Sequence, residues 1–225
     1  MAVNPAIYEA LPYDPLNDFE PISMIGGFPL LVSVHNNTPY HSLDDFIQDA
    51  KSNPGEVDYG SAATSFQLVT EAFAQQAGIK LHHIPYKGSA EAVQAVRSEQ
   101  VPLTFADSAA VLGQIRSGDL RALAVSTSER ISSLPEVPTI RELGYPEYEA
   151  LLWSALYAPA GTPTEIVLTL QQAVQKAVQD PLLLDRIQPL GIEPIGSTRE
   201  ELRATMEKEI ELFTQVVEEA GIDKL

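Results

Sequence analysis

The chain has 225 residues, 44% of them hydrophobic, so it can bury the core of one large or two small domains. Its 14 Lys and Arg against 31 Asp and Glu give a net charge of −17, which repels phosphate backbones and anionic membrane surfaces. We therefore expect no nucleic-acid partner and no lipid partner. The absence of cysteine excludes disulfides, thiol catalysis and cysteine-ligated metals.

The N-terminal region predicts a short helix over residues 5–11 and then a proline-rich turn. It has no basic stretch followed by an apolar core, so we expect no signal peptide in the sequence as written. No apolar run approaches the roughly 18 residues of a membrane span, which predicts no direct membrane insertion. Two apolar runs, Pro21–Ile25 and Leu30–Val34, flank Gly26-Gly27 and form either a hairpin or a crossing between domains.

Residues 57–126 alternate strand-length apolar runs with segments of helical period. This alternation is typical of an α/β domain with a parallel sheet covered by helices on both faces. The predicted strands are 57–61, 81–85, 101–105 and 120–126, with helices beginning at Thr64 and lying near 90–98 and 109–116.

The regular alternation of strand and helix patterns stops after residue 126. A proline-stiffened connection leads to a short helix before Gly144 and a strand over 150–157. Thr162 and Thr198 each predict the N-cap of a later helix. We place the domain boundary in this stretch and expect two domains. The first comprises residues 1–28 and 127–225, and the second comprises residues 29–126.

The turns after the predicted strands indicate the candidate site. Ligands of parallel sheets bind outside the carboxyl ends of the strands, where helix N-termini present free N–H groups. Here those turns are Tyr86-Lys87-Gly88-Ser89 and Ala106-Asp107-Ser108. They predict a site for a small anion. We find no nucleophile, base and orienting group among them, so we do not expect an enzyme.

Several candidate residues have two interpretations. The turn Ser61-Ala62-Ala63-Thr64 either binds a carboxylate or is an ordinary turn in which Thr64 and Gln67 form a capping box. Asp107 either orients a ligand or, more commonly, caps the next helix. Lys87 either pairs with a carboxylate or is solvated, which makes the backbone of Tyr86–Ser89, opened by Gly88, the better candidate.

Trp153, the only tryptophan, either lines a cleft or fills core. The adjacent residues His82 and His83 point to opposite faces of a strand and cannot share a metal ion. No zinc-binding spacing, P-loop or G-x-G-x-x-G occurs, so we expect neither metal nor cofactor.

Once the elements are assigned, the chain resembles, in the order of its sequence motifs, the Bug-type solute receptors of tripartite tricarboxylate transporters. The resemblance extends over essentially the whole chain. It is carried by NPAIYEALPYDPLNDFEPIS, VDYGS, HIPYKGSAEAV, LRALAVSTSERISSLPEVPTIRELGYPEYE, WSALYAPAGTP and GIEPIGSTREEL.

The resemblance implies a type-II periplasmic binding protein fold of two α/β domains that closes around an organic acid and delivers it to a membrane permease. It implies that this sequence begins inside the first domain, whose sheet is then incomplete. It also implies ligand contacts at Ser61, Ala62, Ala63, Thr64, Asp107 and Ser108. The turn at 61–64 departs from the family pattern, with two alanines in place of glycines.

Two alternatives to a receptor stay open. One is a receptor-derived protein that no longer binds tightly and dimerises through the edge of its incomplete sheet. The other is the effector domain of a cytosolic regulator. That alternative needs a helix-turn-helix and a basic face, and the sequence contains neither.

Overall fold

The computed structural model describes residues 1–224, and their contacts divide them into two compact units. Unit 1 comprises Met1–Gly27, Trp153–Gln188 and the chain from Glu193 onward. Unit 2 comprises Phe28–Leu152 and the short return segment Pro189–Ile192.

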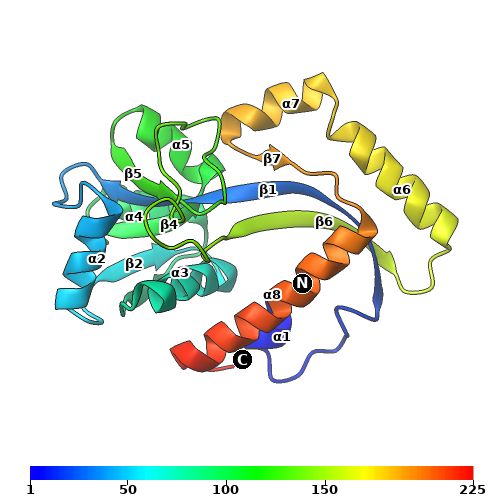
Figure 1. Cartoon of the computed structure of the whole chain (residues 1–225), viewed down its shortest axis with the longest axis horizontal. Helices are drawn as coiled ribbons and strands as arrows, with labels where there is room; N and C mark the ends of the chain where they lie inside the picture. The colour runs from blue at the N-terminus through cyan, green and yellow to red at the C-terminus, as the bar shows by residue number, and fades with distance from the viewer. Residues whose placement is uncertain (225) are drawn as a thin grey trace. The chain divides into compact units, whose positions relative to one another are not determined.

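Strand β1 (Phe19–His35) is a single run of 17 residues that contributes to both units (Figure 1). The two apolar runs predicted around Gly26-Gly27 are therefore one strand, and the hairpin alternative is wrong. The glycines do not interrupt the strand, because Gly26 and Gly27 pair with Pro194 and Glu193.

The sheet of unit 2 has the strand order β3-β2-β4-β1-β5. β2 is parallel to both β3 and β4, whereas β1 lies antiparallel between β4 and β5. The predicted parallel sheet is thus mixed. Strands buried on both faces read as continuous apolar runs whichever way their neighbours point, so the sequence pattern could not reveal this direction. The other strands are β2 (Asp58–Ser61), β3 (His82–Pro85), β4 (Leu103–Asp107) and β5 (Leu120–Val125).

Helices cover both faces of this sheet. The connection from β2 to β3 runs toward one side of the sheet, and the connection from β3 to β4 runs in the opposite direction. Right-handed crossovers that run in opposite directions place their helices on opposite faces, so α3 covers one face and α4 the other. The next crossover puts α5 beside α4, and these two helices are in contact. The helices of unit 2 are α2 (Leu43–Ser52), α3 (Thr64–Ala77), α4 (Ser89–Arg97) and α5 (Ser108–Arg116).

Residues 127–152 pack with unit 2, so the predicted second boundary at 126/127 must be corrected to 152/153. Ile131, Leu134 and Val137 join the apolar cluster that α4 and α5 form with the sheet. Tyr148 packs against Phe73 of α3 and donates a hydrogen bond from its hydroxyl to the Val69 carbonyl (3.0 Å). The proline-rich composition of residues 127–152 therefore marks a segment that packs on unit 2, and not a linker between the two units. The helix expected before Gly144 consists of turns.

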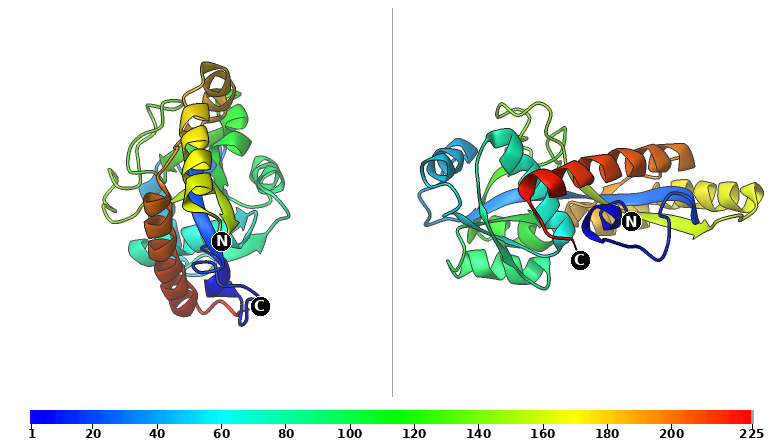
Figure 2. Two further views of the ribbon diagram at one scale, coloured as in Figure 1. Left: turned by 90° about the vertical axis from the view of Figure 1, so that its right-hand side faces the viewer. Right: turned by 90° about the horizontal axis from the view of Figure 1, so that it is seen from below.

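Unit 1 is built on the first half of β1, which pairs with β6 (Leu151–Pro159) and β7 (Glu193–Pro194). Helix α8 (Arg199–Ala220) begins with the predicted Thr198–Glu201 capping box and lies beside α1 (Asn4–Ile7) (Figure 2). Its apolar face buries Leu202, Met206, Phe213, Val216 and Val217. The remaining helices are α6 (Thr164–Ala177), α7 (Pro181–Ile187) and the 3₁₀ turn Gln188–Leu190.

Helix α6 begins one residue later than the predicted cap would give. Its N-cap is Pro163, and the Thr162 hydroxyl donates to the Pro159 carbonyl (2.7 Å). The Thr162 side chain thus stabilises the preceding turn, a competing use of a Thr hydroxyl close to its own backbone.

The return segment Pro189–Ile192 fixes the start of α5. Gly191 has φ +69°, and its carbonyl accepts a hydrogen bond from the Ser108 hydroxyl (2.9 Å). A Cβ on Gly191 would lie 2.8 Å from the Ser108 Cβ and 2.9 Å from the Leu112 Cδ1. Both the left-handed backbone and the close approach therefore require glycine at this position.

We predict that Gly191→Ala lowers the free energy of unfolding by about 3 kcal/mol, through left-handed strain and overpacking against Ser108. Gly118→Ala is the matched control, because Gly118 has φ +82° but open space around its Cβ position. It should cost only about 1 kcal/mol. Urea denaturation of both variants measures the difference, and equal losses would contradict the packing argument.

Candidate ligand-binding site

The structure brings the three predicted turns to one edge of the unit 2 sheet (Figure 1). In the parallel ladder Ser61 is paired with Pro85, and Gly60 is paired with Thr104, three residues before the end of β4. The carboxyl ends of β3, β2 and β4 are therefore neighbours. Tyr86–Gly88, Ser61–Thr64 and Asp107–Ser108 follow these ends directly, as the sequence predicted.

The turn after β2 leaves the first turn of α3 without a side-chain cap. The N-cap is Ala63, whose carbonyl accepts from the Phe66 and Gln67 N–H groups (2.9 and 3.1 Å), and within residues 1–224 no side chain caps it. The predicted Thr64–Gln67 capping box is wrong, because helix α3 starts with Thr64 already inside it. The half-buried Thr64 hydroxyl and the first N–H groups of α3 thus stay available at this edge.

The turn after β3 also leads into a helix without a side-chain cap in the described structure, with Gly88 at the N-cap of α4. The Tyr86 N–H donates to the Ser61 carbonyl (2.9 Å), and the Lys87 N–H donates to the Glu91 carboxylate (3.2 Å). These two backbone donors are therefore already used. Gly88 has φ −166°, an extended conformation open to any residue, and an added Cβ would meet no atom within 4 Å. The close approach of this backbone to a ligand stays a prediction.

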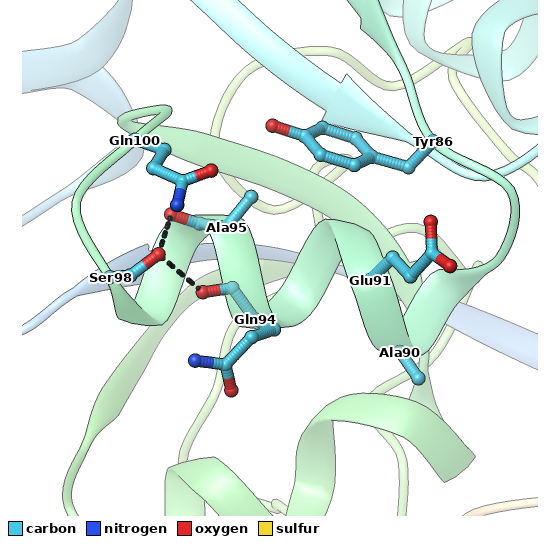
Figure 3. Close-up of a pocket in the computed structure, with 7 residues that line it drawn as sticks. All are labelled: Tyr86, Ala90, Glu91, Gln94, Ala95, Ser98 and Gln100. Carbon is cyan, nitrogen blue, oxygen red and sulfur yellow. Dashed lines mark hydrogen bonds between the residues drawn. The ribbon is translucent and has the colours of Figure 1, made fainter.

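The side chains of this second turn point in different directions. Lys87 is exposed. The Tyr86 ring packs over Gly60, where an added Cβ would lie 3.0 Å from the ring edge. It lines a groove of about 340 Å³ on the α4 side of the sheet (Figure 3). The other residues lining this groove are Ala90, Glu91, Gln94, Ala95, Ser98 and Gln100.

The third turn is occupied by structural hydrogen bonds. The Asp107 carboxylate accepts from the Ala110 N–H (3.0 Å) and caps α5, the commoner of its two predicted uses. The Ser108 side chain is fully buried and donates to Gly191. Any contact of Ser108 with a ligand would have to come from its backbone N–H.

His83 is a site residue that the sequence analysis missed. Its Nε2 lies 2.7 Å from the Ser61 Oγ, and its ring packs against Tyr59 with centroids 5.1 Å apart. The Tyr59 hydroxyl donates to the Glu71 carboxylate of α3 (2.7 Å). Burial lowers the pKa of His83 and raises that of Glu71. The strand register could have suggested this contact, because same-face neighbours on adjacent parallel strands follow from it.

Trp153 belongs to unit 1, where its indole N–H donates to the Glu209 carboxylate of α8 (2.8 Å). Burial raises the pKa of Glu209 to about 7, against the opposing effects of the Trp153 hydrogen bond, the Met1 amino group and Lys208. Tyr157 lies in the same cluster, with its hydroxyl 2.8 Å from the Met206 sulfur, and burial raises its pKa. Trp153 thus has a partner inside unit 1.

Two negative findings apply to the described chain. No three His, Asp or Glu residues of positions 1–224 gather as metal ligands would. Over the same residues, every helix is too short or too polar to cross a bilayer.

A comparison with protein families matches residues 1–222 to the tripartite tricarboxylate transporter family receptor, TctC. The chain belongs to this family. TctC proteins are solute receptors and not enzymes, and the fold is that of the Bug-type periplasmic binding proteins.

Named relatives agree with this assignment. BugT of Bordetella pertussis is 37% identical over 98% of this chain and 68% of its own length. A solved structure of R. palustris Rpa4515 with adipate has a TM-score of 0.86 at 35% identity, covering 99% of this chain and 75% of that one. MatC of Rhodopseudomonas palustris, solved with bound malate, has a TM-score of 0.82 at 25% identity and covers 96% and 75%. This TctC chain therefore spans about two thirds of the length of BugT and three quarters of each solved chain.

Buried Glu209 predicts a pH dependence. Its folded pKa of about 7 exceeds the unfolded value of 4.5, so its contribution to stability is fully present below pH 4.5 and is lost as the pH rises to about 7. The loss amounts to about 3 kcal/mol. Because Trp153 is the only tryptophan, its fluorescence should titrate with a midpoint near pH 7.

Glu209→Gln should abolish this fluorescence transition and make the protein more stable than wild type at pH 8. Glu207→Gln, at an exposed position of α8, is the control and should leave the transition in place. A transition that persists unchanged in Glu209→Gln would contradict the assignment.

Proposed function

We propose that this TctC chain is an extracytoplasmic receptor that binds a small organic acid as its carboxylate, without converting it, for uptake through the permease of a tripartite transporter. The observation that supports it most is the family match over residues 1–222, joined by an adipate-bound relative at 35% identity. The same membership supports the periplasm as its compartment and the permease as its membrane partner.

The turn chemistry of unit 2 supports a carboxylate as the ligand. A carboxylate only accepts hydrogen bonds, and the first turns of α3 and α4 present backbone N–H donors that no side chain of the described residues caps. Helix N-termini add a positive potential that acts within about one turn. This local potential can hold an anion on a chain of net charge −17, because surface charges are screened beyond about 10 Å at 0.1 M salt.

Several candidate residues then have a defined part in binding. The backbone at Ala62 and Ala63 and the Thr64 hydroxyl supply donors from α3, and Gly88 and Ser89 supply N–H groups from α4. The exposed Lys87 ammonium adds a positive charge beside them. The Asp107 side chain holds α5 in place, and Ser108 offers its backbone N–H alone.

Calorimetric titration with adipate, malate and citrate tests this function, and at least one of them should bind. Thr64→Val should weaken binding of that acid about tenfold, the effect of one hydrogen bond to a charged group. Thr169→Val is the matched control, because Thr169 is exposed on α6 and bonds the Glu165 carbonyl. Equal affinity of both variants would remove Thr64 from the site, and no heat with any acid would contradict the function.

A further inference from the structure

We propose that helix α6 of unit 1 is the contact surface of a homodimer, in which α6 of a second copy packs against it in the antiparallel direction. The contact is made by an apolar stripe whose residues recur at helical spacing along one exposed line of the helix. The residues of this α6 stripe are Ile166, Leu170, Ala173 and Ala177. The stripe is a helix face and not the sheet edge that the sequence analysis named.

Helices α6 and α7 bury very little of their apolar surface. Of these two helices, Val167 is the only fully buried residue in the described structure. A different face of α6 contacts the rest of unit 1, because the Gln171 side chain accepts a hydrogen bond from the Arg199 N–H of α8 (2.9 Å). On the α6 stripe, Ile166 is 46% exposed and Leu170 is 37% exposed. Helices in proteins gain most of their stability by packing apolar faces, so a second apolar face that is exposed indicates an interface.

The order of side-chain sizes along the α6 stripe favours a second copy as the occupant. The large residues Ile166 and Leu170 form its N-terminal half, and the small residues Ala173 and Ala177 form its C-terminal half. A two-fold axis through the centre of the stripe places Ile166 opposite Ala177 of the second copy. The same axis places Leu170 opposite Ala173. Large side chains then fill the space beside small ones along the whole contact, as close packing requires.

The charges beside the α6 stripe are arranged in the same complementary order. Glu165 lies in the first turn of α6 and Lys176 in the last turn, about three turns apart, so both lie on the same flank of the stripe. Both side chains are exposed, and neither forms an ion pair within residues 1–224. The two-fold axis brings Glu165 of each copy close to Lys176 of the other, which gives the dimer two ion pairs. Two chains of net charge −17 repel each other, but salt screens the long-range part of that repulsion.

Sedimentation equilibrium of the full chain over a concentration series tests the dimer, at about 0.15 M salt. The wild-type chain should reach the mass of a dimer. Leu170→Gln should raise the dimer dissociation constant about tenfold, because each copy loses an apolar contact. Leu168→Gln is the matched control, since Leu168 is 42% exposed on another face of α6, and it should leave the dissociation constant unchanged. Circular dichroism and thermal melts verify that each variant is folded.

Two charge reversals test the antiparallel direction. Glu165→Lys and Lys176→Glu should each weaken dimerisation about tenfold, because each variant replaces two attractive contacts by two repulsive ones. The two substitutions change the net charge in opposite directions, so an effect of net charge alone would weaken one dimer and strengthen the other. An equimolar mixture of the two variants should restore association, because the mixed dimer again has opposite charges at both contacts.

Three outcomes would contradict the dimer. Leu170→Gln that dimerises as wild type does would remove the α6 stripe from the interface. A mixture of the charge variants that associates no better than its components would exclude the antiparallel pair. A wild-type chain that stays monomeric over the whole series would overturn the inference, and would mean that something other than a second copy covers the α6 stripe.

Discussion

Parallel pairing of β2 with both β3 and β4 is the constraint on which the candidate site depends. Each of these strands is followed directly by a helix, so three helix N-termini meet at one edge of one sheet. The first N–H groups of these helices give that edge a local positive potential on a chain of net charge −17. Any change in strand order would separate these N-termini and remove the convergence.

The three N-termini nevertheless differ in what they leave open. At α5 the Asp107 carboxylate caps the helix and the return segment Pro189–Ile192 engages the Ser108 hydroxyl. At α3 and α4 no side chain of the described residues takes the capping role. The same geometry therefore serves stability at one turn and leaves donors free at the other two. A receptor benefits from this difference, since a rigid neighbour positions donors that a ligand can satisfy.

The Ser61–His83 pair shows why geometry alone does not define an enzyme. A serine hydroxyl hydrogen-bonded to an imidazole is also the first element of a nucleophilic site. Here the serine is buried, and the imidazole packs its ring against the Tyr59 ring. Membership of a receptor family agrees with that arrangement.

Local signals in the sequence determined much of this protein. Helix caps at Ser42, Asp180 and Thr198, the left-handed ends at Gly78 and Gly221, and the order of strands and helices in unit 2 all follow from short-range patterns. So does the gathering of the three turns, because parallel strands have their carboxyl ends on the same side of the sheet.

Only the tertiary structure decided the features that depend on distant segments. These are the antiparallel direction of β1, the packing of residues 127–152 with unit 2, and the Ser108–Gly191 and Ser61–His83 hydrogen bonds. It also decided that Thr64 lies inside its helix and leaves the cap to Ala63. The physical reason is common to all of them. A side chain's nearest partners along the chain are fixed by helix or strand period, whereas its partners across a sheet or a loop depend on register, which the whole fold sets.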